Sequence, residues 1–322
     1  MSDPMKGVVN SLPMFFDSLG NPDFGALECY LNILKTCGEP SLIFPMAYNT
    51  RIAYLSFEEL LELHDVVRIF CKSVNAKWIA VPPYKASEKQ LQFFFDRLTT
   101  DENLYGASIL FPERFYVDDE VFYRYFSVPN EFGIKTVAHE MKMISGKDGS
   151  LMDWPSKVLA NLPQYCDLVA IKEDSKNDAI SRLALADGTY DVLLAGGGMS
   201  QVDRLLSNSP RAWLAGVSLI YPQITNLENS LIQSDDKRHR FVEEVEAPFF
   251  SLCSNLGWHR VHKGLLSIIH KLPIYEPSPM SSLSNQELGD ITFAWEMSIG
   301  PAIQKLLSDT AQHPPNFEKM DI

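Results

Sequence analysis

The sequence lacks the long apolar segments of membrane-spanning and exported proteins. No run approaches the roughly 20 apolar residues that cross a bilayer. Residues 1–16 also lack the long apolar core of a signal peptide, because Asn10, Ser11 and Pro13 interrupt their short apolar stretch. We therefore expect a cytoplasmic protein.

Paired cysteines are missing as well. The cysteines are odd in number, widely spaced and without a C-x-x-C pair, which fits neither a disulfide framework nor a zinc site. We expect most of them to be reduced packing residues, at Cys29, Cys37, Cys71, Cys166 and Cys253.

Positive charge is scarce. Lys and Arg total 28 against 41 Asp and Glu, which gives a formal net charge of −13. A strongly acidic chain repels phosphate backbones and anionic lipid, so we expect neither nucleic acid nor a membrane surface as a partner.

Several short functional motifs are absent too. The chain has no G-x-G-x-x-G, no P-loop, no G-x-S-x-G elbow and no H-E-x-x-H. His259 and His262 have no carboxylate pattern nearby. We therefore expect no cofactor and no metal ion.

What the sequence does contain is a regular alternation of short apolar runs and amphipathic helical segments. Eight such strand-helix units predict a parallel sheet that closes into a (β/α)₈ TIM barrel. An open doubly wound sheet is the alternative, but it usually carries a glycine fingerprint after its first strand, where this chain has none. The predicted strands are Val8–Phe16, Ser41–Ala47, Trp78–Pro82, Ala107–Phe111, Ile134–Ala138, Leu168–Ile171, Val192–Ala195 and Trp213–Leu219.

Helices are predicted between and after these strands. Ser56 and Glu59 form a capping box at the start of one of them. We expect the barrel over 1–225, a helical extension over 226–311 and a mobile tail over 312–322. The predicted helices are Phe57–Phe70, Glu88–Leu98, Trp154–Leu162, Asn226–Gln233, Lys237–Cys253, Arg260–Lys271 and Gln286–Leu307, with a loop at Pro273–Ser284.

Lys172 is the most informative candidate site residue. It closes the run Asp167–Ile171, whose last four residues are apolar, so its stem leaves a buried strand and its amine reaches the barrel mouth, where such enzymes have their active sites. An apolar environment favours the free amine over the ammonium, and a free amine can attack a carbonyl to form a Schiff base. The alternative is a lysine paired with Glu173 or Asp174 that has no catalytic role.

The Lys172 segment resembles a known family. Val169-Ala170-Ile171-Lys172-Glu173-Asp174-Ser175, then Ala195-Gly196-Gly197-Gly198, is similar to the Schiff-base lysine region of the dihydrodipicolinate synthase/N-acetylneuraminate lyase family. Leu12-Pro13-Met14-Phe15 stands where the family has T-P-F, and Leu55-Ser56-Phe57-Glu58-Glu59 where it has L-S-x-E-E. The resemblance implies a TIM barrel, often tetrameric, that acts on pyruvate or a related 2-keto acid.

The sequence departs from the family around this lysine. Tyr48 and Asn49 stand in the family's G-T-T-G-E segment, which holds the substrate carboxylate. His139 stands near the family's catalytic tyrosine, and a histidine of pKa ~6.5 could supply the proton transfer within the catalytic pH range. Arg114 could bind a carboxylate in a new position. A hydrogen-bonded structural histidine and an interface salt bridge are the alternatives for these two residues.

Three further positions complete the predicted site. Gly196 and Gly197 match the part of the family that lets the backbone approach the substrate, and Tyr221 follows the eighth strand. We predict a Schiff-base-forming lyase, aldolase or dehydratase that acts on a 2-keto acid, pyruvate-like or sugar-derived, and that is not dihydrodipicolinate synthase itself. The alternative is a non-catalytic barrel that binds a keto acid or sugar acid.

A homo-oligomer, dimer or tetramer, is expected. The late helices carry more apolar residues than barrel helices need, namely Leu265, Ile268, Ile269, Phe293, Met297 and Ile299.

Overall fold

The computed structural model describes residues 7–37, 40–46, 50–110, 119–139, 160–173, 190–194, 212–214, 216–231 and 239–309. The described residues group into two compact units. The barrel unit contains those of 7–12, 40–194 and 212–214. The helical unit contains those of 13–37 and 216–309.

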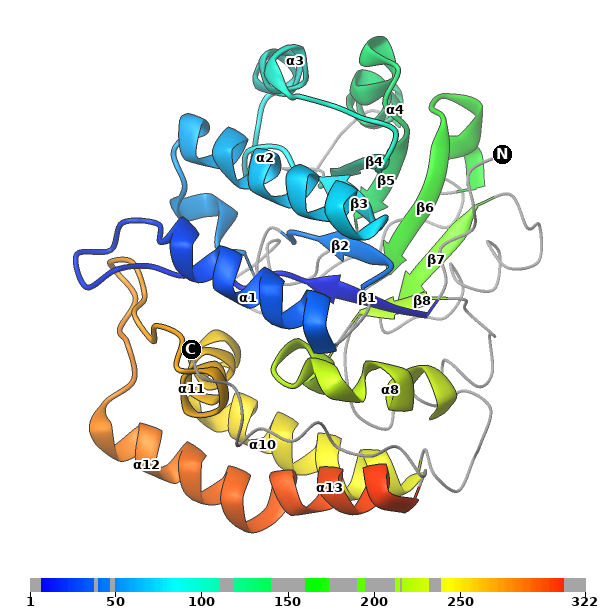
Figure 1. The fold of residues 1–322 in the computed structure, drawn as a ribbon. Coiled ribbons are helices and arrows are strands. Elements are labelled where there is room, and N and C mark those ends of the chain that lie inside the picture. Colours follow the sequence, from blue (N-terminus) through cyan, green and yellow to red (C-terminus); the bar gives the residue numbers. More distant parts are fainter. Residues whose placement is uncertain are drawn as a thin grey trace. The chain divides into compact units, whose positions relative to one another are not determined.

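The barrel unit is built on eight parallel strands that close in sequence order (Figure 1). Closure is made by β1 and β8, where Gly7 pairs with Ala212 and Val9 with Leu214. The predicted TIM barrel is therefore confirmed, and the open doubly wound sheet is excluded. The strands are β1 (Gly7–Ser11), β2 (Leu42–Phe44), β3 (Lys77–Ala80), β4 (Leu104–Ile109), β5 (Thr136–His139), β6 (Leu168–Glu173), β7 (Asp191–Leu194) and β8 (Ala212–Leu214).

The first and last predicted strands are shorter in the structure than the apolar runs suggested. Residues 12–16 are buried but lie outside β1, and Pro13 has no N–H to donate to a sheet ladder. Val217–Leu219 forms a 3₁₀ turn, η5, in place of the end of a strand. Burial alone does not make these segments strands, because an apolar run also fits a buried turn.

Three helices of the barrel unit lie outside its strands in Figure 1: α2 (Phe57–Val74), α3 (Glu88–Arg97) and α4 (Asp119–Ser127). The predicted capping box of α2 is confirmed. Ser56 Oγ accepts from the Glu59 N–H at 3.3 Å, and Glu59 Oε2 accepts from the Ser56 N–H at 2.7 Å. The predicted helix Trp154–Leu162 lies largely outside the described residues.

The helical unit holds the predicted late helices. They are α8 (Thr225–Leu231), the π-helical stretch η7 (Val242–Glu246), α10 (Ala247–Leu256), α11 (Trp258–His270), α12 (Asn285–Ala294), the π-helical stretch η8 (Trp295–Ile299) and α13 (Gly300–Asp309). The segment 273–284 is irregular, as predicted. The unit also includes α1 (Phe24–Cys37), η5 and a second 3₁₀ turn, η6 (Pro222–Ile224). In the described part of the chain, no helix combines the length and apolarity that crossing a membrane requires.

Candidate active site

Lys172 lies one residue before the end of β6, inside the barrel unit. It is the Cα partner of His139 on β5 and of Leu193 on β7. Its side chain is only 2% exposed. The predicted position of this lysine at the C-terminal end of a buried strand is therefore confirmed.

His139 is the last residue of β5 and is completely buried. Its Nδ1 lies 3.3 Å from Ser108 Oγ on the neighbouring strand β4. Its ring also meets Phe44 of β2 in an edge-to-face contact, with 5.9 Å between the ring centroids. Since β3 and β4 separate β2 from β5, this contact crosses the interior of the barrel.

Electrostatics keep His139 neutral. Burial, together with the positive charge of Lys172, holds the pKa of His139 well below its ordinary value. This finding differs from the expectation that His139 titrates in the catalytic range. The expectation used the ordinary histidine pKa, whereas an apolar interior and a neighbouring ammonium both disfavour the imidazolium.

His139 also has an unused hydrogen-bonding atom. Its Nε2 is buried and has no hydrogen-bond partner among the described residues. If Nδ1–H donates to Ser108, Nε2 is a bare acceptor that can take up a proton. The site thus combines a buried amine with a neutral imidazole whose second nitrogen is available.

A second polar pair crosses the barrel nearer the start of the strands. The Tyr105 hydroxyl of β4 donates to Asp191 Oδ2 of β7 at 2.9 Å. Asp191 is the Cα partner of Ala170, two residues before Lys172 on β6. This pair gives the barrel interior a polar layer about 6.6 Å along the strand from Lys172.

Of the predicted site residues, the structure brings together Lys172 and His139. Tyr221 belongs to the helical unit, where its hydroxyl accepts a hydrogen bond from Gln304 Nε2 at 3.1 Å. Five others, Tyr48, Asn49, Arg114, Gly196 and Gly197, lie outside the described residues. Substrate binding by these six residues stays a prediction.

The sequence reasoning missed Ser108 and Phe44. Both lie within runs that were correctly predicted as strands, and each is one of the last two residues of its strand. A small polar residue at the end of an apolar strand was the available signal for Ser108. The contact of Phe44 with His139 depends on barrel closure, so no local pattern could have indicated it. Among the described residues, no three His, Cys, Asp or Glu side chains come together as metal ligands.

Comparison with known proteins gives a likeness of fold. No family model and no curated protein matches the sequence. Solved structures do match over nearly the whole chain. One is the 4-hydroxy-tetrahydrodipicolinate synthase of the thermoacidophilic methanotroph Methylacidiphilum fumariolicum SolV, with a TM-score of 0.76 at 15% identity, covering 95% of this chain and 98% of that one.

Two further structures come from the same group of folds. The N-acetylneuraminate lyase of Proteus mirabilis has a TM-score of 0.75 at 13% identity, covering 93% of this chain and 99% of that one. YagE, a prophage protein of E. coli K12 from the dihydrodipicolinic acid synthase family, was solved with pyruvate. It has a TM-score of 0.75 at 13% identity, covering 91% of this chain and 98% of that one. The resemblance indicated by the Lys172 segment is thus confirmed at the level of the fold.

Proposed function

We propose that this protein is a Schiff-base-forming lyase, aldolase or dehydratase that acts on a 2-keto acid, with Lys172 as the nucleophile. The proposal rests on one arrangement, the buried Lys172 side chain beside a neutral His139 whose Nε2 has no partner among the described residues. Removing an ammonium from water costs free energy. Burial of Lys172 is therefore unfavourable for a lysine whose only role is to carry a charge.

The chemistry begins with the amine. The Lys172 nitrogen adds to C2 of the keto acid, the carbonyl oxygen leaves as water, and a C=N⁺ bond remains. This iminium withdraws electrons from the C–H and C–C bonds that join C3 to its other substituents. Loss of a proton from C3 gives an enamine that can attack a carbonyl compound. The reverse sequence splits a carbon–carbon bond, and water then releases the product from Lys172.

His139 is the proposed base for the C3 proton. A neutral imidazole with a bare Nε2 can accept that proton, and Ser108 would hold the tautomer that leaves Nε2 bare. Because the Lys172 iminium carries the same positive charge as the ammonium, His139 stays neutral until the proton transfer occurs.

The structural neighbours support the substrate class. YagE was solved in complex with pyruvate, and the other two proteins are named as a synthase and a lyase of the same fold. We carry a 2-keto acid over to this chain as part of the proposal. Arg114, with Tyr48, Asn49, Gly196 and Gly197, is the proposed recognition set for its acid group.

Borohydride trapping across a small panel tests this proposal. The panel is pyruvate, 2-oxobutyrate and a 2-keto-3-deoxy sugar acid, with lactate as the matched acid that has no carbonyl. We expect at least one keto acid, and not lactate, to add covalent mass to the protein after reduction. Failure of every keto acid would overturn the proposal. Trapping without turnover of the trapped acid would favour the non-catalytic barrel.

A further inference from the structure

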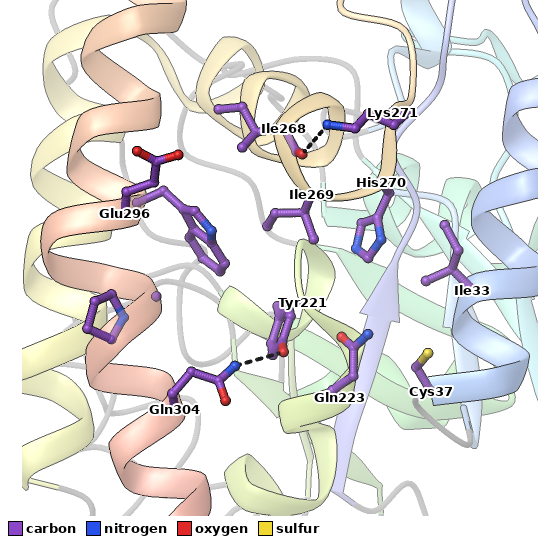
Figure 2. A pocket seen from close by; sticks show the side chains of 13 residues that line it. Ile33, Cys37, Tyr221, Gln223, Ile268, Ile269, His270, Lys271, Glu296 and Gln304 are labelled. Atoms are coloured by element: carbon purple, nitrogen blue, oxygen red, sulfur yellow. Dashed lines mark hydrogen bonds between the residues drawn. The ribbon is translucent and has the colours of Figure 1, made fainter. Parts of the chain in front are cut away.

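A second candidate site lies entirely within the helical unit. A cavity of about 710 Å³ opens between the C-terminal end of α1, the turn η6, the end of α11 and the junction of η8 with α13 (Figure 2). Pockets that bind small molecules in proteins have volumes of about 300–1,000 Å³. The cavity is therefore large enough for a metabolite.

Gln223 gives this cavity its chemical character. The residue is only 9% exposed, and neither its amide oxygen nor its amide nitrogen has a hydrogen-bond partner among the described residues. Figure 2 shows the amide beside Tyr221 and Cys37, with its end toward His270. An amide buried without hydrogen-bond partners is unfavourable, so a ligand that supplies both a donor and an acceptor would be stabilised by this side chain.

Of the groups around the amide, Tyr221 and His270 are uncharged, and the lining also holds one basic and one acidic residue, Lys271 and Glu296. The Tyr221 hydroxyl accepts a hydrogen bond from Gln304. His270 Nε2 lies 3.0 Å from the Ile220 carbonyl, which can only accept, so this nitrogen carries the proton. Burial lowers the pKa of His270, which keeps the ring neutral at pH 7. Tyr221 and His270 suit a polar but uncharged ligand.

An aromatic wall completes the cavity. The Trp295 ring packs against Tyr221 at 5.8 Å between centroids, with 57° between the planes, and both residues line the cavity. Ile33 and Ile269 add apolar surface. Flat rings pack well on indole faces and edges.

We propose that this cavity binds a small uncharged ligand with a planar ring and a lactam or carboxamide edge. The ring packs against Trp295, and the neighbouring donor and acceptor of the edge pair with the acceptor and donor of Gln223. This site is separate from the proposed keto-acid site and does not depend on Lys172.

Calorimetric titration of the full chain with 2-quinolone tests the proposal, since this bicyclic lactam has a flat ring and the required edge. We expect a dissociation constant of about 1 mM or tighter, which is reasonable for so few atoms. N-methyl-2-quinolone keeps the ring and the carbonyl but loses the donor, so it should bind about tenfold more weakly. Binding to Lys172→Ala should be unchanged, which separates this test from that of the proposed function.

Two variants locate the interaction. Gln223→Met keeps the length of the side chain but removes both hydrogen-bonding groups, and should weaken 2-quinolone binding about tenfold. Gln92→Met is the matched control, because Gln92 is an exposed residue of the barrel unit that donates to Glu131. The control should bind 2-quinolone like the wild type.

The wild-type chain also carries its own reporter. Cys37 lines the cavity, whereas Cys29 of the same helix is exposed and does not. Bound 2-quinolone should slow alkylation of Cys37 by N-ethylmaleimide and leave Cys29 unaffected, as read by peptide mass mapping. This readout decides the matter even if Gln223→Met fails to fold. No heat of binding at millimolar lactam, equal binding of the methylated lactam, or binding without protection of Cys37 would each overturn the proposal.

Discussion

Lys172 and His139 are Cα partners at the C-terminal ends of two adjacent barrel strands, and the charge of the lysine helps to keep the histidine neutral. Neighbouring strands lie about 4.8 Å apart, so the backbone positions of the two residues are adjacent in the barrel. A nucleophilic amine and a proton acceptor at this spacing can serve the same substrate carbon and its neighbour in turn.

Lys172 and His139 should contribute to different steps of the reaction, imine formation and proton transfer. His139→Gln should still form the borohydride-reducible imine, but its turnover should fall by about 10²–10⁴-fold, the usual contribution of a general base. The wild-type rate should show no histidine inflection near pH 6.5, because the pKa of His139 lies well below that value. Parallel measurement of trapping and steady-state turnover checks this. Equal loss of both would indicate a structural role for His139.

His64 should make the protein sensitive to acid. Its Nδ1–H donates to the Leu60 carbonyl at 2.6 Å, and its Nε2 accepts from the Val81 N–H at 2.9 Å, so neither nitrogen has room for a second proton. Burial lowers the pKa of His64 to about 4. Because the folded pKa lies below the unfolded value, the stabilisation is present above pH 6.5 and is lost as pH falls through about 4.

The measurement for His64 is urea unfolding at pH 7.5 and at pH 4.5. His64→Gln should cost about 1–3 kcal/mol at the higher pH, where it breaks a buried pair of hydrogen bonds. The difference in unfolding free energy between wild type and variant should shrink at the lower pH. A difference that stays constant across this range would count against the assigned cause.

Glu228 should make the folded protein less stable as pH rises, which is the opposite of the effect of His64. Its buried carboxyl accepts from the Ser218 N–H at 3.0 Å and lies 2.5 Å from Ser218 Oγ, and burial raises its pKa to about 7. A raised pKa means that the stabilisation is complete below pH 4.5 and is lost as pH rises through about 7. Glu228→Gln, which keeps an acceptor for Ser218, should therefore become more stable than wild type as pH rises. The gain should reach about 3 kcal/mol at most near pH 8, and a pH-independent difference in melting experiments would refute the raised pKa.

The predicted homo-oligomer has a specific test on the helical unit. Leu265 and Ile299 are buried within that unit, but Phe293 of α12 and Met297 of η8 are each 67% exposed. They lie four residues apart, on one face of a continuous helical run. Sedimentation of the wild type should show a species larger than 36.4 kDa, and Phe293→Glu with Met297→Glu should shift it toward that mass. Ile69→Glu, at an exposed apolar position of α2, is the control and should leave the assembly intact.

Much of the barrel could be predicted from the sequence because its strands are buried on both faces. Such strands appear as short apolar runs between amphipathic segments, and Lys172 stands out because it ends one of them. The capping box at Ser56 is equally local, since Ser56 and Glu59 are three residues apart. Features fixed within a few residues were therefore predicted well.

Features that depend on closure of the barrel could not be predicted from the sequence. The contact between Phe44 and His139 joins residues 95 positions apart on strands that are not neighbours. The low pKa of His139 follows from burial and from a charge on another strand, so the ordinary histidine value was the wrong guide. The orphaned amide of Gln223 likewise depends on which helices surround it.

The location of the trapped adduct tests directly whether Lys172 is the nucleophile. Wild-type protein should carry the reduced keto acid on the peptide that contains Lys172, and Lys172→Met, which keeps the unbranched stem, should carry none. Lys77→Met is the matched control, because Lys77 begins strand β3 and its Nζ donates to the Glu102 carbonyl at 2.9 Å. It should label like the wild type. Label that persists in Lys172→Met, or maps to another lysine in the wild type, would contradict the central claim that Lys172 is the nucleophile.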